Sequence, residues 1–496
     1  MSGTPSTEAL PDATGAGTDG SPWVKRWARR LPWQRHLRTF CSLTAASQIE
    51  AALSFATTVT LVRLVGSTAA GEVLLAQSMA SVWFMLWDPR LEDAQQRFVP
   101  MEQRRGSGHG TRLYRRLLRL DVVAGLLTTV VGVVAALAAA ALGWIPAEQL
   151  SLLVPAVLAG GAATPSGSAS AGFAIADQLS RLGVIRVMLA VFGCLVTLTA
   201  LLTAGTVGYL AASVITGLVS TVTVTVVACR QVRLACGPPT DGPAPMPPGL
   251  LPFLVKSSAT GSVSLASDSG VSLLAGLLGG PTLVTYLKIA GAPGRLYGSF
   301  VNPVASQLYP RLARAGAHGR REAVMRDALR CSALIGGIGL VVVVVAASLL
   351  DLLLGLMYGP EYTILSTAAV VMLAGAALRG TAIWSKVLPS ALGVPGVRLV
   401  FLTAEGVCQL GMLASVIHLC AGASGRTVAW AWGYLGLLSL STAGWFIVLW
   451  CLTRAMPDPS VQAGPGPVAS GPVPMRQARA AAETTEFSRA PEQNRR

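Results

Sequence analysis

Apolar runs of about twenty residues follow one another along most of the chain, from about residue 41 to residue 453, with short polar segments between them. An α-helix of that length spans the hydrocarbon core of a bilayer, which is about 30 Å thick. The pattern therefore predicts an all-α polytopic membrane protein with about twelve transmembrane helices. The predicted spans cover residues 41–64, 71–92, 121–144, 150–175, 183–204, 207–229, 250–277, 282–306, 329–350, 363–384, 397–420 and 428–452.

Polar segments divide the chain into five parts. The Pro/Gly-rich sequence CGPPTDGPAPMPPG separates six predicted spans from six, and the C-terminal segment has too few large apolar residues to fold alone. We expect a basic, disordered cytoplasmic tail, a first six-helix bundle, a cytoplasmic linker, a second six-helix bundle and a disordered cytoplasmic tail. These parts correspond to residues 1–40, 41–229, 230–249, 250–453 and 454–496.

The basic residues between the spans predict which side of the membrane each segment faces. With twelve spans, alternate segments hold nearly all of the arginines and lysines, whereas the other segments hold only Arg63 and Arg426. Cytoplasmic loops carry such an excess of basic residues. The pattern therefore predicts a multi-pass plasma-membrane protein with both termini in the cytoplasm.

Composition argues against several functional classes. The net charge of +15 comes largely from segments between spans and at the chain ends, so it does not indicate a nucleic-acid-binding face. The eight cysteines form no CxxC pair, which argues against a zinc site or a disulfide framework. A membrane polymerase or glycosyltransferase is poorly supported, because the predicted outer loops are short and the sequence lacks DxD and HExxH motifs. We expect no catalytic residue, no metal site and no cofactor.

The two halves show a weak internal repeat. Aligning Thr68 with Thr282 brings six identical pairs into register near the start, bend and exit of the same helix in each half. Such repeats are common in transporters. The other five pairs are Leu64 with Leu278, Gly66 with Gly280, Ala76 with Ala290, Pro89 with Pro303, and Arg97 with Arg311.

Charged residues inside the predicted spans lie on polar helical stripes. Glu50 belongs to such a stripe in the first span and Asp268 to one in the seventh. In the eighth span, Lys288, Arg295 and Asn302 follow one another at intervals of seven. Ionisable groups at this depth usually face a partner or a water-filled cavity. We therefore predict that these five residues bind substrate in a cavity between the halves; the alternative is a packing seam of small residues.

Three further charged residues lie toward the C-terminus. Glu405, in the eleventh span, is a candidate proton or cation site, which would allow coupling to a proton or sodium gradient. Arg379 and Lys386 lie near the inner end of the tenth span, and we interpret them as anchors at the membrane surface.

Four stretches, in the same order along the chain, resemble the polysaccharide or oligosaccharide-lipid flippases of the multidrug/oligosaccharidyl-lipid/polysaccharide exporter superfamily. They are LVRLVGSTAAGEVLLAQSMASVWFMLWDPRLEDAQQRFVP, DSGVSLLAGLLGGPTLVTYLKIAGAPGRLYGSFVNPVASQLYPRLAR, LLGLMYGPEYT and ALGVPGVRLV. The resemblance covers residues 41–453. It implies a V-shaped pair of six-helix bundles with a central cavity lined by spans 1, 2, 7 and 8. The sequence departs from the family where Asp88-Pro89-Arg90 replaces the frequent Asp-x-Gly.

The stretch LWDPRLEDAQQRFVP concentrates charge where the second span leaves the membrane. Asp88, Arg90 and Arg97 lie at the cytoplasmic mouth of the cavity that the resemblance implies. Spacing favours an ion pair between Arg90 and Asp93 and another between Asp93 and Arg97. The stretch is either an anchor at the helix end or an entrance whose arginines meet a diphosphate, which suits the guanidinium fork.

The resemblance implies a flippase that moves a polyprenyl-diphosphate-linked oligosaccharide from the inner to the outer leaflet by alternating access, in cell-surface polysaccharide biosynthesis. Its partners would be the lipid bilayer and a polysaccharide polymerase or glycosyltransferases. The alternative is a cation-coupled exporter of drugs or secondary metabolites from the same superfamily. Basic residues at mid-depth, Lys288 and Arg295, favour an anionic head group and hence the flippase.

Overall fold

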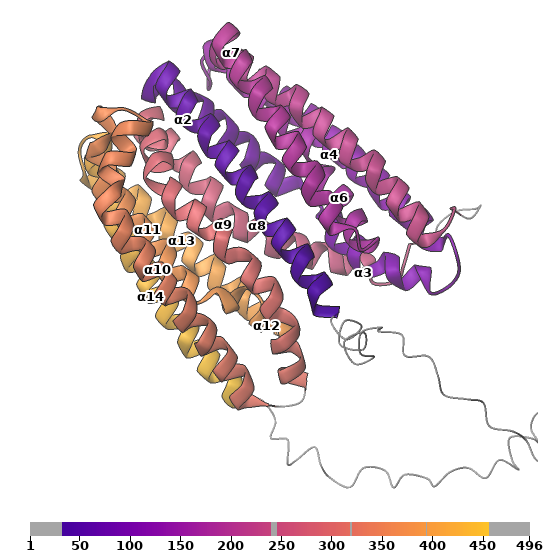
Figure 1. Cartoon of the computed structure of the whole chain (residues 1–496). Helices are drawn as coiled ribbons and strands as arrows, with labels where there is room; N and C mark the ends of the chain where they lie inside the picture. The colour runs from indigo at the N-terminus through magenta and orange to yellow at the C-terminus, as the bar shows by residue number, and fades with distance from the viewer. Residues whose placement is uncertain (1–31, 240–245, 318–319, 393, 456–496) are drawn as a thin grey trace, which may run out of the picture.

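The computed structural model describes residues 32–239, 246–317, 320–392 and 394–455, which form helices joined by short connections, without a strand in these ranges (Figure 1). The first half contains α2 (Pro32–Trp87), α3 (Leu91–Gln103), α4 (His109–Ala141), α5 (Ala147–Ala163), α6 (Ser166–Ile175) and α7 (Leu179–Cys236). The second half contains α8 (Leu250–Gly279), α9 (Pro281–Ala317), α10 (Arg321–Met357), η1 (Pro360–Leu365), α11 (Ser366–Thr381), η2 (Ile383–Lys386), α12 (Leu388–Ala391), α13 (Pro395–Leu419) and α14 (Ala423–Ala455).

The predicted fold class is confirmed, because helices cover most of every predicted span. The continuous helix α2 holds the first two spans and bends at Gly66, and α7 holds the fifth and sixth and bends at Gly205. Eight helices in the described ranges are long and apolar enough to cross a bilayer, and these two double-length helices are among them. Figure 1 shows two bundles that meet along α2, α8 and α9. The bundles diverge toward the end that carries α3 and α12.

Large apolar side chains cover the outside of the bundles. In the most apolar 18-residue segment of α7, only 11% is buried inside the protein. Leu195, Leu202 and Val226 are each more than 60% exposed. A water-soluble protein does not present so extensive an apolar surface. This surface is therefore suited to contact with lipid tails.

Two helices extend beyond the predicted edges of the first bundle. The helix α2 begins at Pro32, inside the predicted tail 1–40, and α7 continues to Cys236, inside the predicted linker 230–249. Both extensions contain arginine in their sequences, and long basic side chains allow a helix to continue past the membrane core. The helix α8 begins at Leu250. Residues 1–31, 240–245 and 456–496 lie outside the described residues.

Small residues of α5, in the predicted span 150–175, bring this helix close to α4. This span is the least apolar of those predicted. A side chain added at Gly161 would overlap Thr129 of α4, and one added at Gly160 would overlap Phe84 of α2. Such close approach between helices is the usual function of glycine in a membrane interface. Pro165 separates α5 from α6, so this span is a broken helix rather than a straight one.

The backbone supports the internal repeat. Gly66 has φ 78° and ψ 174°, and Gly280 has φ 88° and ψ 166°, a region that glycine alone occupies readily. The hydroxyls of Thr68 and Thr282, 214 positions apart in sequence, are within 3.3 Å of each other. A two-fold axis between two halves brings equivalent residues together beside it. The threonine contact and the matching glycine conformations therefore fit a pseudo-twofold axis near this pair.

Contacts around this axis occur in reciprocal pairs. Thr285 donates a hydrogen bond to the carbonyl of Ser67 at 2.7 Å, and the equivalent pair, Gly71 and Pro281, is in direct backbone contact. A cluster of buried hydrophobic side chains continues this interface, because it joins Leu61 and Val73 of α2 with Ile289 of α9. The bundles are consequently packed together at the end that charge predicts to be extracellular.

Replacing Gly71 with alanine will weaken this outer contact. The added Cβ would overlap the carbonyl of Pro281, so α2 and α9 must move apart. We expect a cysteine placed at Ser67 to react at least several-fold faster with an impermeant thiol reagent in the Gly71→Ala background. Gly337→Ala is the matched control, since a Cβ at that helical position meets nothing within 4 Å. Unchanged reactivity at Ser67 would show that the outer contact does not depend on Gly71.

Thiol labelling in intact cells tests the predicted topology. Ser107, between α3 and α4, and Glu148, at the start of α5, are both exposed and lie at opposite ends of α4. In a variant without native cysteines, Glu148→Cys should react with an impermeant reagent and Ser107→Cys should react only after permeabilisation. Labelling at Ser107 in intact cells would contradict the assignment of both termini to the cytoplasm.

Candidate substrate-binding cavity

A cavity of about 450 Å³ lies inside the second bundle, enclosed by α8, α9, α11, η2, α13 and α14. Aromatic side chains form part of its wall, among them Tyr297, Trp430 and Tyr434. Its described lining also contains five cationic side chains and one acidic side chain. They are Lys288, Arg295, Arg379, Lys386, Arg398 and Glu405.

The predicted stripe on α9 supplies two of these cations. Lys288, Arg295 and Asn302 all line the cavity, because positions seven apart lie on one face of a helix. Arg295 is exposed to the cavity, and its Nη2 donates to the backbone carbonyl of Lys288 at 2.5 Å. Gly291 and Gly294 line the cavity beside them and leave room for the long side chain.

The opposite wall comes from α11, η2 and α13. The Nζ of Lys386 donates to Oδ1 of Asn302 at 2.6 Å, which connects this wall to the α9 stripe. Arg398 Nη1 donates to the carbonyl of Lys386 at 3.0 Å. Sequence reasoning assigned Arg379 and Lys386 to membrane anchoring, but both line the cavity. Arg398 and Glu405 lie seven positions apart on α13, a period that could have indicated a shared face, whereas Arg379 and Lys386 lie in different elements.

The only acidic group in the described lining is already paired. Glu405 Oε1 is 2.9 Å from Arg379 Nη2, and Glu405 Oε2 accepts a hydrogen bond from Ser441 at 2.7 Å. The Glu405 side chain is 6% exposed, whereas that of Arg379 is 39% exposed and reaches the cavity. Both carboxylate oxygens thus have protein partners, which makes Glu405 a poor candidate for binding a coupling ion.

Among the described lining residues, cationic side chains therefore outnumber acidic ones by five to one, and Arg379 pairs with the one acid, Glu405. Positive charge concentrated in a cavity with low-dielectric walls attracts anions strongly. Guanidinium groups suit phosphate or carboxylate oxygens in particular, since they donate two parallel hydrogen bonds.

Two other predicted site residues are not placed in this cavity. Glu50 of α2 is half-buried and interacts electrostatically with Arg186 of α7, on the first-bundle side. The prediction that Glu50 lines a cavity between the halves therefore stays a prediction. Asp268 belongs to α8, but its side chain lies outside the described residues.

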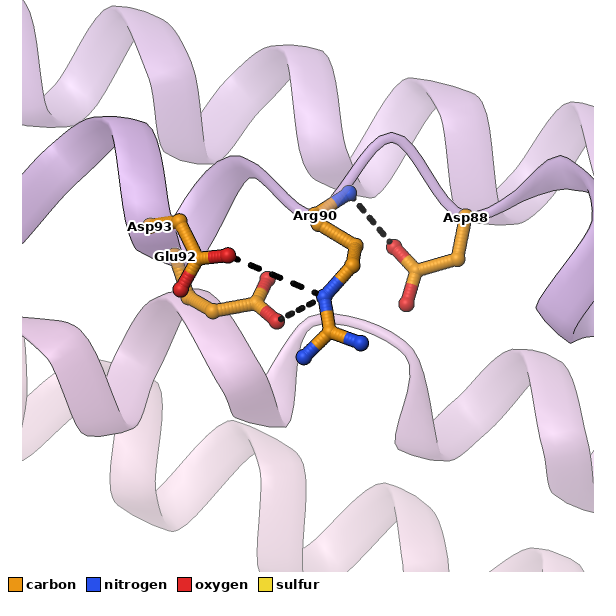
Figure 2. Close-up of polar contacts among 4 residues, drawn as sticks. All are labelled: Asp88, Arg90, Glu92 and Asp93. Carbon is orange, nitrogen blue, oxygen red and sulfur yellow. Dashed lines mark hydrogen bonds and ion pairs between the residues drawn. The ribbon is translucent and has the colours of Figure 1, made fainter. Parts of the chain in front are cut away.

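At the predicted mouth, charged residues organise a break between α2 and α3 (Figure 2). Asp88 Oδ1 accepts a hydrogen bond from the backbone N–H of Arg90 at 3.0 Å, and Arg90 adopts a left-handed conformation with φ 46°. Arg90 Nε lies 3.5 Å from Glu92 Oε1 and 3.8 Å from Asp93 Oδ2, so the predicted pair of Arg90 and Asp93 is present. These contacts assign Asp88 and Arg90 to stabilising the break.

Arg97 has a different environment. Its guanidinium carbon lies 4.7 Å from the ring centroid of Phe253 in α8 and 5.5 Å from that of Phe98. This cation–π contact, with the edge-to-face pair of Phe98 and Phe253, joins α3 to the start of the second bundle. Arg97 is exposed, so it is the mouth arginine best placed to meet an incoming anion.

Comparison with solved structures identifies the fold. A transporter of the MOP superfamily from Pyrococcus furiosus, described as having a binding pocket of reverse polarity that suggests a different function, matches with a TM-score of 0.63 at 13% identity. The match covers 84% of this chain and 96% of that one. The MATE transporter VcmN of Vibrio cholerae, in its bent form, gives 0.59 at 14% identity, covering 84% and 97%. An inward-facing multidrug resistance transporter of the MATE family gives 0.57 at 12% identity, covering 84% and 96%.

By sequence, no family model and no curated protein matches the chain. The similarity to solved structures therefore concerns the fold. The chain has the two-bundle helical fold of MATE transporters in the MOP superfamily over residues that include both bundles.

Proposed function

We propose that the protein is a membrane transporter that moves a polyprenyl-diphosphate-linked oligosaccharide from the inner to the outer leaflet of the plasma membrane. The observation that carries this proposal is the composition of the described cavity lining, which contains the cationic side chains of Lys288, Arg295, Arg379, Lys386 and Arg398 and one acidic side chain, that of Glu405. A diphosphate head group is the anion of a lipid-linked sugar, and its oxygens would accept hydrogen bonds from these side chains.

The arrangement of the bundles suits uptake from the cytoplasmic side. The bundles meet at the predicted outer end, around Thr68 and Thr282, and diverge toward the other end (Figure 1). A substrate from the inner leaflet would pass the exposed Arg97 at the mouth. Alternating access then requires the outer contact to open while the inner ends close.

A second candidate is a cation-coupled exporter of drugs or secondary metabolites. One of the structurally similar proteins is a multidrug resistance transporter of the MATE family, so the fold suits this role equally well. The cavity charge disfavours cationic drugs. Anionic drugs or metabolites fit it as well as a diphosphate does, and the MOP transporter with a binding pocket of reverse polarity is the more relevant comparison.

Two assays in bacteria distinguish these functions. The first is complementation of a strain that lacks the flippase of a cell-surface polysaccharide pathway, with surface polysaccharide as the readout. The second is drug susceptibility in a strain that lacks its main exporters. We expect restored polysaccharide and unchanged susceptibility. Resistance without polysaccharide, at equal abundance in the membrane, would favour the exporter.

The same proposal names the enzymes that act before and after transport. We propose that glycosyltransferases build the substrate on the cytoplasmic leaflet and that a polysaccharide polymerase uses it after transport. Because Glu405 is paired with Arg379, the proposal assigns no coupling ion to that carboxylate.

A further inference from the structure

A second cavity, of about 540 Å³, lies on the outside of the second bundle between the start of α10 and the end of α14. It shares no lining residue with the substrate cavity. Arg321, Arg326, Arg330 and Arg454 contribute four guanidinium groups to it, and Glu322 contributes the one carboxylate among its described lining residues. The cavity therefore has a strong excess of positive charge.

The floor of this cavity is apolar. Met325 and Leu329 lie one turn apart on α10, and Trp450 faces them from α14. Leu329 is 46% exposed and Trp450 is 47% exposed, so this surface is open to whatever surrounds the helices. The Arg454 guanidinium carbon lies 3.8 Å from the Trp450 ring centroid, which positions a cation at the edge of the apolar surface.

Both helix ends belong to the predicted cytoplasmic side. The helix α10 begins at Arg321 and α14 ends at Ala455, so Trp450 lies about one turn deeper in the membrane than Arg454. The cations lie near the level of the lipid head groups, and the apolar surface faces the acyl chains. The two features match the two parts of a phospholipid. Basic pockets between transmembrane helices on the cytoplasmic side bind acidic lipid head groups.

We propose that this cavity is a binding site for an anionic phospholipid of the inner leaflet. The phosphate lies among Arg326, Arg330 and Arg454, where guanidinium groups donate to its oxygens. The acyl chains lie along Leu329 and Trp450. A free phosphate would use the arginines but gain nothing from this apolar floor, which is why the site is assigned to a lipid.

Binding of short-chain lipids to the purified full-length protein in a non-ionic detergent tests the proposal. The probes are dihexanoyl phosphatidylglycerol, dihexanoyl phosphatidylcholine and glycerol phosphate. We expect phosphatidylglycerol to bind at least tenfold more tightly than either of the others. In Arg326→Gln/Arg330→Gln its affinity should fall roughly 30-fold, since each basic residue near a membrane surface contributes about 1 kcal/mol toward acidic lipid.

Matched variants keep the result interpretable. Arg230→Gln/Arg233→Gln removes two exposed arginines from the cytoplasmic end of α7, outside the cavity, and should leave phosphatidylglycerol binding unchanged. Arg326→Lys/Arg330→Lys retains the charge and should stay within a few-fold of the wild type. Trp450→Ala should weaken both lipids and leave glycerol phosphate unaffected.

Three outcomes would overturn the proposal. Equal affinity for the two lipids would show that head-group charge is not recognised. Glycerol phosphate binding as tightly as phosphatidylglycerol would show a site for free phosphate. Full phosphatidylglycerol binding in Arg326→Gln/Arg330→Gln would place the lipid elsewhere on the protein.

Discussion

Arg295→Glu will abolish transport while leaving the protein in the membrane. Arg295 lines the cavity and is exposed to it, with Lys288 and Asn302 on the same face of α9. Reversing its charge places a carboxylate where an anionic head group would bind, and like charges at close range in a low-dielectric site repel strongly. We expect polysaccharide to fall by at least a hundredfold in the complementation assay, at unchanged membrane abundance.

Substitutions at the same position separate charge from geometry. Arg295→Lys keeps the charge but loses the bidentate fork, so transport should fall only in part, by about tenfold. Arg233→Glu, a charge reversal at an exposed position of α7 outside the cavity, is the matched control and should remain active. Wild-type activity in Arg295→Glu would mean that the residue does not contact substrate.

Arg379→Gln will destabilise the protein more than Glu405→Gln. Removing Arg379 leaves the Glu405 carboxylate, 6% exposed, with Ser441 as its remaining hydrogen-bond donor in the described structure. An uncompensated buried charge costs several kcal/mol; because the cavity side of the pair is half-exposed, we expect about 2–3 kcal/mol. Removing Glu405 leaves Arg379 facing the cavity, where water can solvate it, and should cost about 1 kcal/mol.

The double variant completes this test. Arg379→Gln/Glu405→Gln removes both charges, so its stability should return close to that of Glu405→Gln alone. Thermal unfolding of the purified protein provides the Tm values for the four-protein cycle. Arg233→Gln is the control, because Arg233 is exposed on α7 and lies outside the cavity. Additive losses in the double variant would show that the two side chains are energetically independent.

The sequence by itself determined the fold class and the order of the spans along the chain. A bilayer requires about twenty apolar residues per helix, so each span is readable without knowledge of its neighbours. The repeat was also readable, although weakly, because the bends at Gly66 and Gly280 require a conformation that glycine adopts readily. The α9 stripe was predicted because its period is local to one helix.

The repeat also shows where sequence alignment misleads. Pro89 and Pro303 align, yet α2 ends before Pro89 whereas α9 continues through Pro303. The break in the first half depends on Arg90 in the left-handed conformation, held by Asp88. The equivalent residue is Val304, and a β-branched side chain strongly disfavours that conformation. Identical prolines therefore have different structural consequences.

Only the tertiary structure decided which charges share a cavity. Arg379, Lys386 and Arg398 come from three elements, and each by itself resembles a residue that anchors a helix at the membrane surface. Their convergence with Asn302 and Glu405 depends on how α11, η2 and α13 pack against α9. Helix periodicity defines the face on which a residue lies, but the neighbour of that face is set by packing between helices distant in sequence. The electrostatic interaction of Glu50 with Arg186 likewise depends on how α2 packs against α7.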